Sequence, residues 1–178
     1  MADCFYGIED LKISPTIPSS VTDMSYTIAY CTSLTTAPTI PNSVTSTNWM
    51  FQDCINLTQA PTIPNSVMDA AGMFYGCIKL SKAPIIPDSV INATNMFAQC
   101  TGLTQAPTIP SSVTEAQNIF ANCTNLVGTL RIEATNIWSG NLLYGSSIDK
   151  IQVPANSLTE TSIRNEYGSN PNITIETF

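Results

Sequence analysis

The chain has 178 residues, enough for one ordinary domain, and carries 13 acidic against 6 basic residues for a net charge of −7. So few Lys and Arg residues speak against nucleic-acid binding, which needs clustered basic side chains. No apolar run approaches the roughly 20 residues of a membrane span, and the lack of histidine removes the most common general base and metal ligand.

The first residues show neither the basic n-region nor the apolar h-region of a signal peptide. A repeat starts at once, because Phe5-Tyr-Gly-Ile8 matches Phe74-Tyr-Gly-Cys77, and the half-turn expected before it is missing. Solenoids normally close their ends with atypical repeats. We therefore expect an uncapped N-terminal edge, which indicates a domain cut from a longer chain, a partner packed there, or self-association.

The segment Pro-Thr-Ile-Pro-Asn/Ser-Ser-Val, or a close variant, recurs five times at a constant interval of 23 residues. The copies start at Pro15, Pro38, Pro61, Pro84 and Pro107. A fixed period of about 20 to 50 residues is the signature of a solenoid, in which each turn packs on its neighbours. The sequence therefore predicts an α/β solenoid rather than a domain around one central core.

Other residues repeat with the same period and predict the path of each turn. Ala93, Met96, Phe97 and Cys100 follow the i, i+3, i+4, i+7 spacing of a helix face, so we expect a short helical or 3₁₀ segment there. Serines a few residues upstream are suited to cap it or turn the chain into it, namely Ser43, Ser66 and Ser89.

Proline limits the strand in each turn. The residue before a proline is pushed toward β or polyproline geometry, and proline cannot donate to a strand ladder. The alanines before the repeated prolines should therefore be extended, at the end of strands of about three residues; they are Ala37, Ala60, Ala83 and Ala106.

The combination of Cys-x-x-Leu-x-x-Ala, Ile-Pro-x-Ser-Val and Met-Phe-x-x-Cys over residues 5–126 resembles the BspA-like (Treponema-type) bacterial leucine-rich repeats. The resemblance implies a right-handed horseshoe or rod with strands on the concave face. Together with the residue pattern, it predicts that these parallel strands are very short and that short helical or 3₁₀ segments form the convex face. It also implies adhesion to host matrix, to other cells or to glycans.

After residue 126 the repeat degenerates, and we expect a C-terminal cap. Residues 127–133 fit a strand, and Ile148, Ile151 and Val153 suggest another. Ser157-Leu-Thr-Glu160 forms a capping box for a helix over 158–167, and Ile173 and Ile175 alternate as a final strand. The predicted organisation is therefore leucine-rich repeats over 1–126 and degenerate turns with a cap over 127–178.

The cysteine column predicts buried thiols rather than disulfides. Stacked turns place equivalent residues about 4.8 Å apart with parallel Cβ vectors, whereas a disulfide needs Cβ atoms about 3.8 Å apart and converging. The spacing of 23 residues, without Cys-x-x-Cys or histidine, predicts no metal site and no cofactor. Carboxylates do not pair at a recurring position, so we expect no catalytic residues and no enzyme activity.

Positions that vary between turns are candidates for ligand binding. The residue before each alanine should face outward and form a polar stripe on the concave face: Thr36, Gln59, Lys82 and Gln105. A second candidate surface groups Tyr26, Tyr30 and Trp49 in the early turns. The alternative is that Tyr26 and Trp49 merely cover an irregular second turn.

Two functions fit these patterns better than an enzyme does. The first is an interaction or adhesion module of the bacterial surface or secreted type, binding a protein or glycan ligand without inserting into the membrane. The second is a structural or decoration protein of a bacteriophage virion, docked through its uncapped N-terminal edge. Localisation follows the choice, extracellular or cell surface if a signal peptide was removed, and otherwise the virion.

Overall fold

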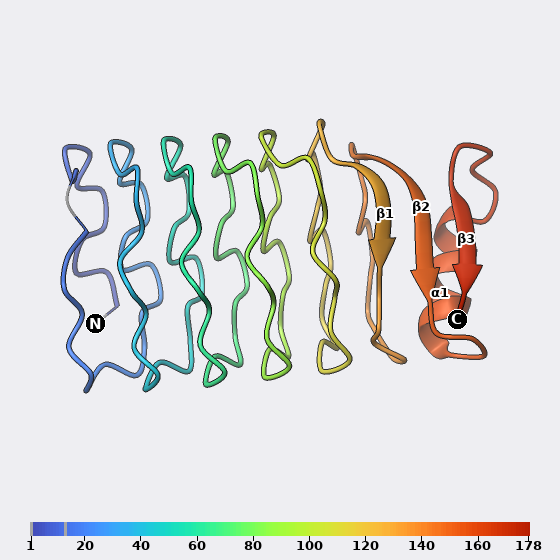
Figure 1. Ribbon diagram of the computed structural model, residues 1–178, viewed down its shortest axis with the longest axis horizontal. Coiled ribbons are helices and arrows are strands. Elements are labelled where there is room, and N and C mark those ends of the chain that lie inside the picture. The colour runs from blue at the N-terminus through green and yellow to red at the C-terminus, as the bar shows by residue number, and fades with distance from the viewer. Residues whose placement is uncertain (1, 13) are drawn as a thin grey trace.

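The computed structural model describes residues 2–12 and 14–178, which wind into a row of stacked turns with the two termini at opposite ends (Figure 1). Two long segments of each turn lie on opposite sides of a thin interior. We call the side that holds residues 35–41 and their repeats the strand face. The side that holds residues 46–54 and their repeats is the turn face. The repeat solenoid predicted from the period is confirmed, while its right-handed sense stays a prediction.

Among the described residues, regular strands occur on the strand face only toward the C-terminus. They are β1 (Val127–Arg131), β2 (Ser147–Val153) and β3 (Thr174–Thr177), which form a parallel sheet in the order β1-β2-β3. The β1–β2 pairing begins at Val127 with Ser147 and shifts register between Gly128 and Thr129, and the β2–β3 pairing begins at Lys150 with Thr174. These ranges agree with the strands expected after residue 126.

Earlier turns replace the strands with single bridges. Thr36 bridges Gln59 and Ile109 bridges Ile132, both in parallel orientation. The physical reason is the proline column, which removes a donor at the same rung of successive turns. In β1 the position equivalent to Pro107 is taken by Leu130, and there the ladder becomes continuous. The strands expected before the alanines are therefore even shorter than predicted.

The turn face contains no helix or 3₁₀ segment between residues 93 and 100, so that prediction is wrong. The backbone makes consecutive turns instead, with Asn95 and Gln99 at φ values of 56° and 62°. Within the turn Met96 donates to the carbonyl of Ala93 at 3.1 Å, but Asn95 donates to Gln117 of the next turn at 2.9 Å. Hydrogen bonds to the next turn thus replace the bonds that would continue a helix.

The serines expected to cap those helices have a different partner. The hydroxyl groups of Ser43, Ser66 and Ser89 donate to the carbonyl oxygens of Val21, Val44 and Val67 at 2.6, 2.6 and 2.7 Å. Each serine therefore links its turn to the preceding one, because the carbonyl oxygen of the earlier turn lies within reach where a helix amide was expected.

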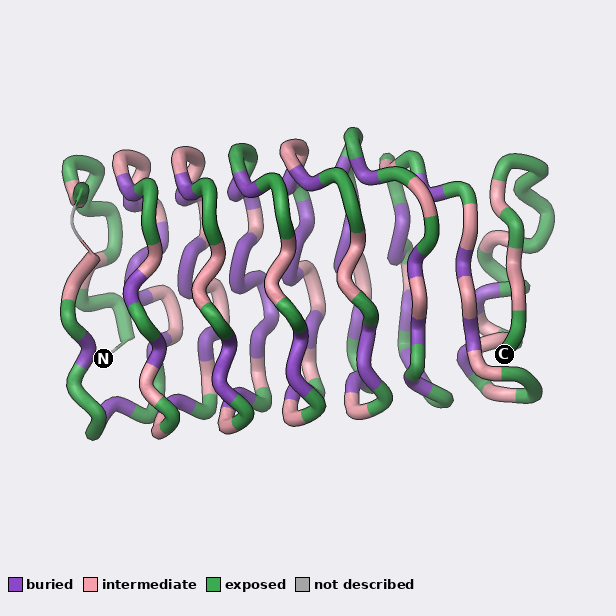
Figure 2. Tube along the Cα trace, viewed as in Figure 1, coloured by how far each residue is buried: buried purple, intermediate pink, exposed green. Residues whose placement is uncertain are grey.

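The interior is a set of side-chain columns, and buried stretches run along both long faces (Figure 2). Phe51, Phe74, Phe97 and Phe120 are fully buried and stack in parallel with ring centroids 5.6 to 5.7 Å apart. The period of 23 residues places equivalent rings in successive turns directly above one another. The apolar columns therefore form one hydrophobic core that runs along the solenoid and stabilises the stacking of turns.

The C-terminal region adds one helix, α1 (Leu158–Tyr167). The Ser157 hydroxyl accepts from the Glu160 amide at 2.9 Å, and the Glu160 carboxylate accepts from the Asn156 amide at 2.7 Å. Ile163 is fully buried against the last turns. The capping box thus starts the helix as its sequence indicates, while the division of the chain at residue 126 stays a prediction.

Candidate functional site

The polar stripe predicted on the concave face lies on the strand face, and all four of its residues are exposed: Thr36, Gln59, Lys82 and Gln105. Each precedes a half-buried alanine that packs against the core, as expected for an outward residue beside an inward one. The stacking of turns aligns the four side chains along the solenoid. Their part in binding stays a prediction.

An open groove runs across the strand face beside this stripe and encloses about 1320 Å³. Three successive turns contribute the same set of positions to its lining. The half-buried lining residues are Ala60, Pro61, Ala83, Pro84, Ala106 and Pro107, and exposed lining residues on either side of them are Gln59, Thr62, Lys82, Ile85, Gln105 and Thr108. A smaller hollow of about 340 Å³ continues it over Ala37 and Pro38 toward the N-terminus.

The groove is open because small or ring-closed residues line it. Alanine has a single methyl group, and proline holds its ring close to the backbone, so neither fills the space between the longer side chains beside them. Among the described residues, no backbone hydrogen bond links residues 58–64 to 81–87 or 81–87 to 104–110. The strand face in these turns therefore keeps backbone groups available to solvent or to a ligand.

Among the groove residues, Gln59, Lys82 and Gln105 were predicted from the sequence as binding positions. The exposed residues on the other side of the Ala-Pro pairs were not predicted, and these are Thr62, Ile85 and Thr108. Ile85 is 86% exposed, where the preceding and following turns have Thr62 and Thr108. The signal was present in the sequence, because Pro84-Ile-Ile-Pro departs from the Pro-Thr-Ile-Pro of the other turns.

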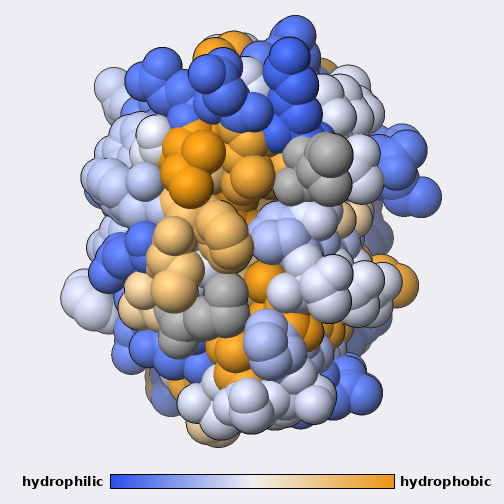
Figure 3. All heavy atoms as spheres, turned by 90° about the vertical axis from the view of Figure 1, so that its left-hand side faces the viewer, coloured by the Kyte–Doolittle hydropathy of each residue, from blue (hydrophilic) through white to orange (hydrophobic). Residues whose placement is uncertain are grey.

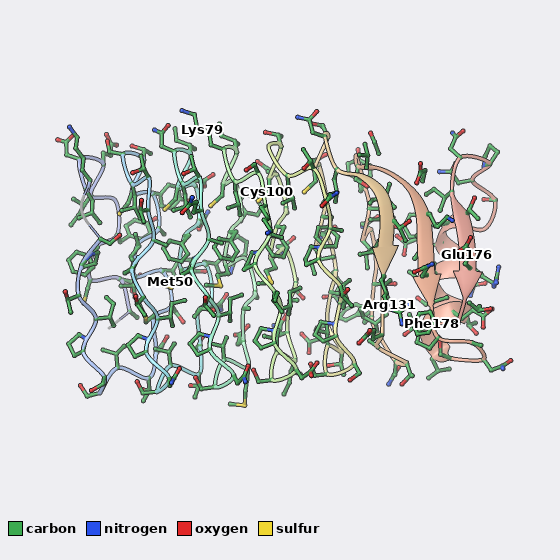
Figure 4. All side chains as sticks on the ribbon, in the orientation of Figure 1. Met50, Lys79, Cys100, Arg131, Glu176 and Phe178 are labelled. Carbon is green, nitrogen blue, oxygen red and sulfur yellow. The ribbon has the colours of Figure 1, made fainter. Side chains whose placement is uncertain are left out.

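At its C-terminal side the strand face becomes more charged. The Arg131 guanidinium carbon lies 3.7 Å from the Phe178 ring centroid, and its Nε lies 3.2 Å from the Glu133 carboxylate. Lys150 pairs with Glu176 at 2.9 Å across β2 and β3. Figure 4 labels Arg131, Glu176 and Phe178 in this C-terminal region. Exposed pairs of this kind contribute little to stability. Among these residues Glu133 also lines the groove, so the groove has an acidic group at this end.

The second candidate surface, on the turn face, is a packed aromatic cluster. Tyr26 and Trp49 stack at 6.4 Å with a 7° interplanar angle, and Trp49 lies 5.3 Å from Tyr75. Both Tyr26 and Trp49 are half-buried. The Trp49 ring covers Gly72 so closely that a Cβ there would collide with it. Trp49 thus fills the space left by a glycine in the next turn, and a role of Tyr26 and Trp49 in binding stays a prediction.

Tyr30 belongs to a neighbouring part of the same face. Its ring contacts Tyr6 edge-on at 5.2 Å, and its hydroxyl accepts from the Gln52 amide at 2.7 Å. The nearby Asp53 carboxylate packs over Gly76, and partial burial raises its pKa above the usual value, although the Gln52 hydrogen bond acts in the opposite direction. The early turns therefore present aromatic side chains together with polar groups.

The cysteine column is a structural element. Its five thiols are free and buried, as predicted: Cys31, Cys54, Cys77, Cys100 and Cys123. Each Sγ donates to a backbone carbonyl 26 residues earlier, at 3.0 to 3.2 Å. Burial raises the pKa of the Cys54 and Cys123 thiols to about 12, so these side chains remain protonated and unreactive near neutral pH.

Two further types of site receive no support from the side chains that the structure describes. In residues 2–12 and 14–178, no group of three or more Cys, Asp or Glu side chains could hold a metal ion. Over the same residues, no helix has the length and apolar character needed to cross a membrane.

Comparison with known proteins supplies the family. The model of the BspA type leucine-rich repeat region matches six copies over residues 1–104 and 70–170. The crystal structure of a leucine-rich repeat protein from Bacteroides ovatus is similar over 100% of this chain, with 17% sequence identity and a TM-score of 0.46. The chain spans 63% of the length of that protein. No curated protein matches the chain.

The family match includes the repeated Cys, Leu and Pro columns and extends into the C-terminal region that carries β1, β2 and α1. It covers well over half of the chain. The chain belongs to the BspA type leucine-rich repeat family.

Proposed function

We propose that this chain is a non-catalytic interaction and adhesion module that binds a protein or glycan partner in the groove of its strand face. Membership in the BspA type family indicates an interaction module, and repeats of this kind are typically non-catalytic. The strand-face groove is the observation that supports the location. It combines about 1320 Å³ of open space with a row of exposed polar side chains.

The groove suits recognition through many weak contacts. Its amide and hydroxyl side chains can donate and accept hydrogen bonds, and Ala and Pro offer apolar surface between them. Binding sites typically combine an apolar lining with a few placed polar groups. We place the module at the bacterial surface or outside the cell, as is typical of the family.

A binding array with immobilised matrix proteins and glycans tests the proposal. The variant with Ala at Thr36, Gln59, Lys82 and Gln105 should bind the ligands of the wild type at least about tenfold more weakly, because several contacts are lost together. Its melting temperature should stay close to that of the wild type, because exposed substitutions usually change stability by less than about 0.5 kcal/mol each. If the variant and the wild type bound every ligand with equal affinity, the groove would be excluded as the binding site.

The aromatic cluster allows a parallel test of the second surface. Asn occupies the Trp49 position in later turns, at Asn95 and Asn118, with similar positive φ values of 56° and 55°. Trp49→Asn together with Tyr26→Asn should reduce ligand binding if the early turns take part. Loss of stability with unchanged affinity would assign both residues to the packing of the second turn.

The second candidate function is a structural or decoration protein of a bacteriophage virion. Apolar side chains gather in the middle of the N-terminal end (Figure 3), and Tyr6 and Ile8 in the first turn are 51% and 42% exposed. Such a surface suits docking to an assembly partner or a second copy. Virion genes flanking the reading frame would support this function, whereas further repeats encoded upstream would cover the end and contradict it.

A further inference from the structure

Between residues 82 and 88 of the fourth turn, the sequence departs from that of the third turn at three positions, and all three line the groove. Lys82, Ile85 and Asp88 stand where the preceding turn has Gln59, Thr62 and Asn65. The residues between them keep the repeated pattern of Ala, Pro, Ile and Pro, which the architecture needs. The departures therefore lie in side chains that face the groove and leave the backbone pattern unchanged.

The isoleucine has little packing role at this position. Ile85 is 86% exposed, while the next residue, Ile86, is 4% exposed and belongs to the core. Replacing the usual threonine by isoleucine therefore adds apolar surface in water without filling the interior. A single exposed apolar residue needs no explanation by itself, but this one lies between two charged residues in the middle of a groove.

The two charges are available to a ligand. Lys82 is the only cation among the residues that line the groove, and both Lys82 and Asp88 are exposed. Among the described residues, no ion pair involves either side chain, whereas Arg131, Lys150 and Arg164 each pair with a glutamate. The fourth turn thus offers one positive and one negative group without an internal partner of opposite charge.

The prolines of this turn set the spacing of the three side chains. Pro84 and Pro87 hold the segment near polyproline geometry, which has three residues per turn and a rise of about 3.1 Å per residue. The exposure of the segment follows that period, because Lys82, Ile85 and Asp88 are exposed whereas Ile86 and Pro87 are buried, and three residues of such an extended chain span about 9 Å. Lys82, Ile85 and Asp88 therefore form a line of positive, apolar and negative groups across the strand face.

From this arrangement we infer that the fourth turn is the specificity-determining centre of the groove. Its ligand is an extended segment of a partner protein. That segment carries an acidic side chain for Lys82, an apolar side chain for Ile85 and a basic side chain for Asp88, at intervals of about three residues. This inference rests on the proposed function and gives it a ligand class. A glycan fits less well, because isoleucine lacks the flat aromatic face on which sugar rings stack.

The repeat itself supplies variants that keep the fold. Lys82→Gln, Ile85→Thr and Asp88→Asn together restore the side chains of the third turn, so the same backbone should hold them. The probe is a random library of linear peptides, selected on the wild-type chain. Enriched peptides should carry acidic, apolar and basic residues at three-residue intervals, and the triple variant should bind them at least about tenfold more weakly.

A charge exchange tests the direct contact. Lys82→Gln alone should weaken binding by about two- to fivefold, and salt should reduce the difference, because the pair is exposed. Lys82→Glu should weaken binding of the selected peptide more than Lys82→Gln does, because repulsion replaces attraction, and should regain affinity for a peptide whose acidic residue is replaced by lysine. A structural role of Lys82 would not give this rescue.

A second variant separates this inference from the proposed function. Ala60→Arg with Ala106→Arg fills the groove on both sides of the fourth turn. If this variant loses binding and the triple variant does not, the groove remains the proposed binding site, but the fourth turn is not its specificity-determining centre. If neither variant loses binding, both proposals fail. Selected peptides without the three-residue pattern, or a glycan whose binding depends on the same three residues, would also overturn the peptide ligand.

Discussion

The two long faces of the solenoid are built from the same repeats but held together differently. On the turn face, four backbone hydrogen bonds of 2.7 to 2.9 Å join residues 93–99 to residues 115–121 of the next turn. On the strand face, the described residues of the same two turns show no such bond between 81–87 and 104–110. Between these two turns the turn face therefore carries the backbone hydrogen bonds, and the strand face remains open.

Backbone conformation explains the difference. The turn face places residues with positive φ four apart, so that alternate amides point toward the next turn. The strand face has proline where an amide donor would be needed, and its chain is extended without a ladder. A repeat protein can thus be stabilised through one face while the other carries exposed, variable side chains. Four predictions test this division.

The largest effect should come from the phenylalanine column. Phe74→Ala removes a fully buried ring that stacks on two others at 5.6 Å, so unfolding should become easier by about 3–5 kcal/mol. Denaturant unfolding monitored by circular dichroism measures the change. A loss below about 1 kcal/mol would show that the turn face does not depend on this column.

Gly72→Ala should destabilise the turn face by about 2 kcal/mol, because alanine is strained at positive φ and its Cβ meets the Trp49 ring. Gly7→Ala is the matched control, since Gly7 has φ +70° and no atom near its Cβ position. The difference between the two variants isolates the ring contact. Equal losses would show that Trp49 moves aside without cost.

Alkaline pH should weaken the fold through the cysteine column. Thiols ionise near pH 8.5 in the unfolded chain, whereas burial raises the pKa of Cys54 and Cys123 to about 12 in the folded chain. Between these values the folded state holds more protons, so stability falls as pH rises, by about 1.4 kcal/mol per thiol and pH unit.

Unfolding free energies measured at pH 8 and above test this slope. Cys123→Ala should be less stable at neutral pH, because it loses the hydrogen bond to the Phe97 carbonyl. Its stability should nevertheless decline less steeply with pH, by the contribution of one thiol. The same slope in both proteins would mean that the thiol of Cys123 is not protected in the folded state.

The smallest effect should come from the strand face. Pro61→Ala removes a half-buried ring that takes part in no ladder, so stability should fall by at most about 1 kcal/mol, mainly because the unfolded chain becomes more flexible. Thermal unfolding beside Phe74→Ala measures the contrast between the faces. A loss as large as that of Phe74→Ala would show that the strand face also holds the turns together.

Much of the fold was predictable from the sequence because each residue of a repeat has the same neighbours in every turn. The column of Cys100 was expected to be buried, and it is. The outward position of Lys82 followed from the proline and alanine beside it. The helix at Leu158–Tyr167 followed from local capping chemistry, which depends on residues close in sequence.

Other features depended on contacts between turns and could not be predicted this way. The spacing of Ala93, Met96, Phe97 and Cys100 fits one face of a helix, but it fits two successive four-residue turns equally well. The groove residue Ile85 was overlooked because its column was read as architecture, although its departure from threonine was visible.

The sequence by itself determined the period, the buried columns and the interruption of the strands, because these follow from spacing and from the missing amide of proline. Only the tertiary structure decided which hydrogen bonds replace a helix on the turn face, which carbonyl each thiol meets, and that Trp49 covers Gly72. These features arise between residues that are one turn apart in the chain and become neighbours only when the turns stack.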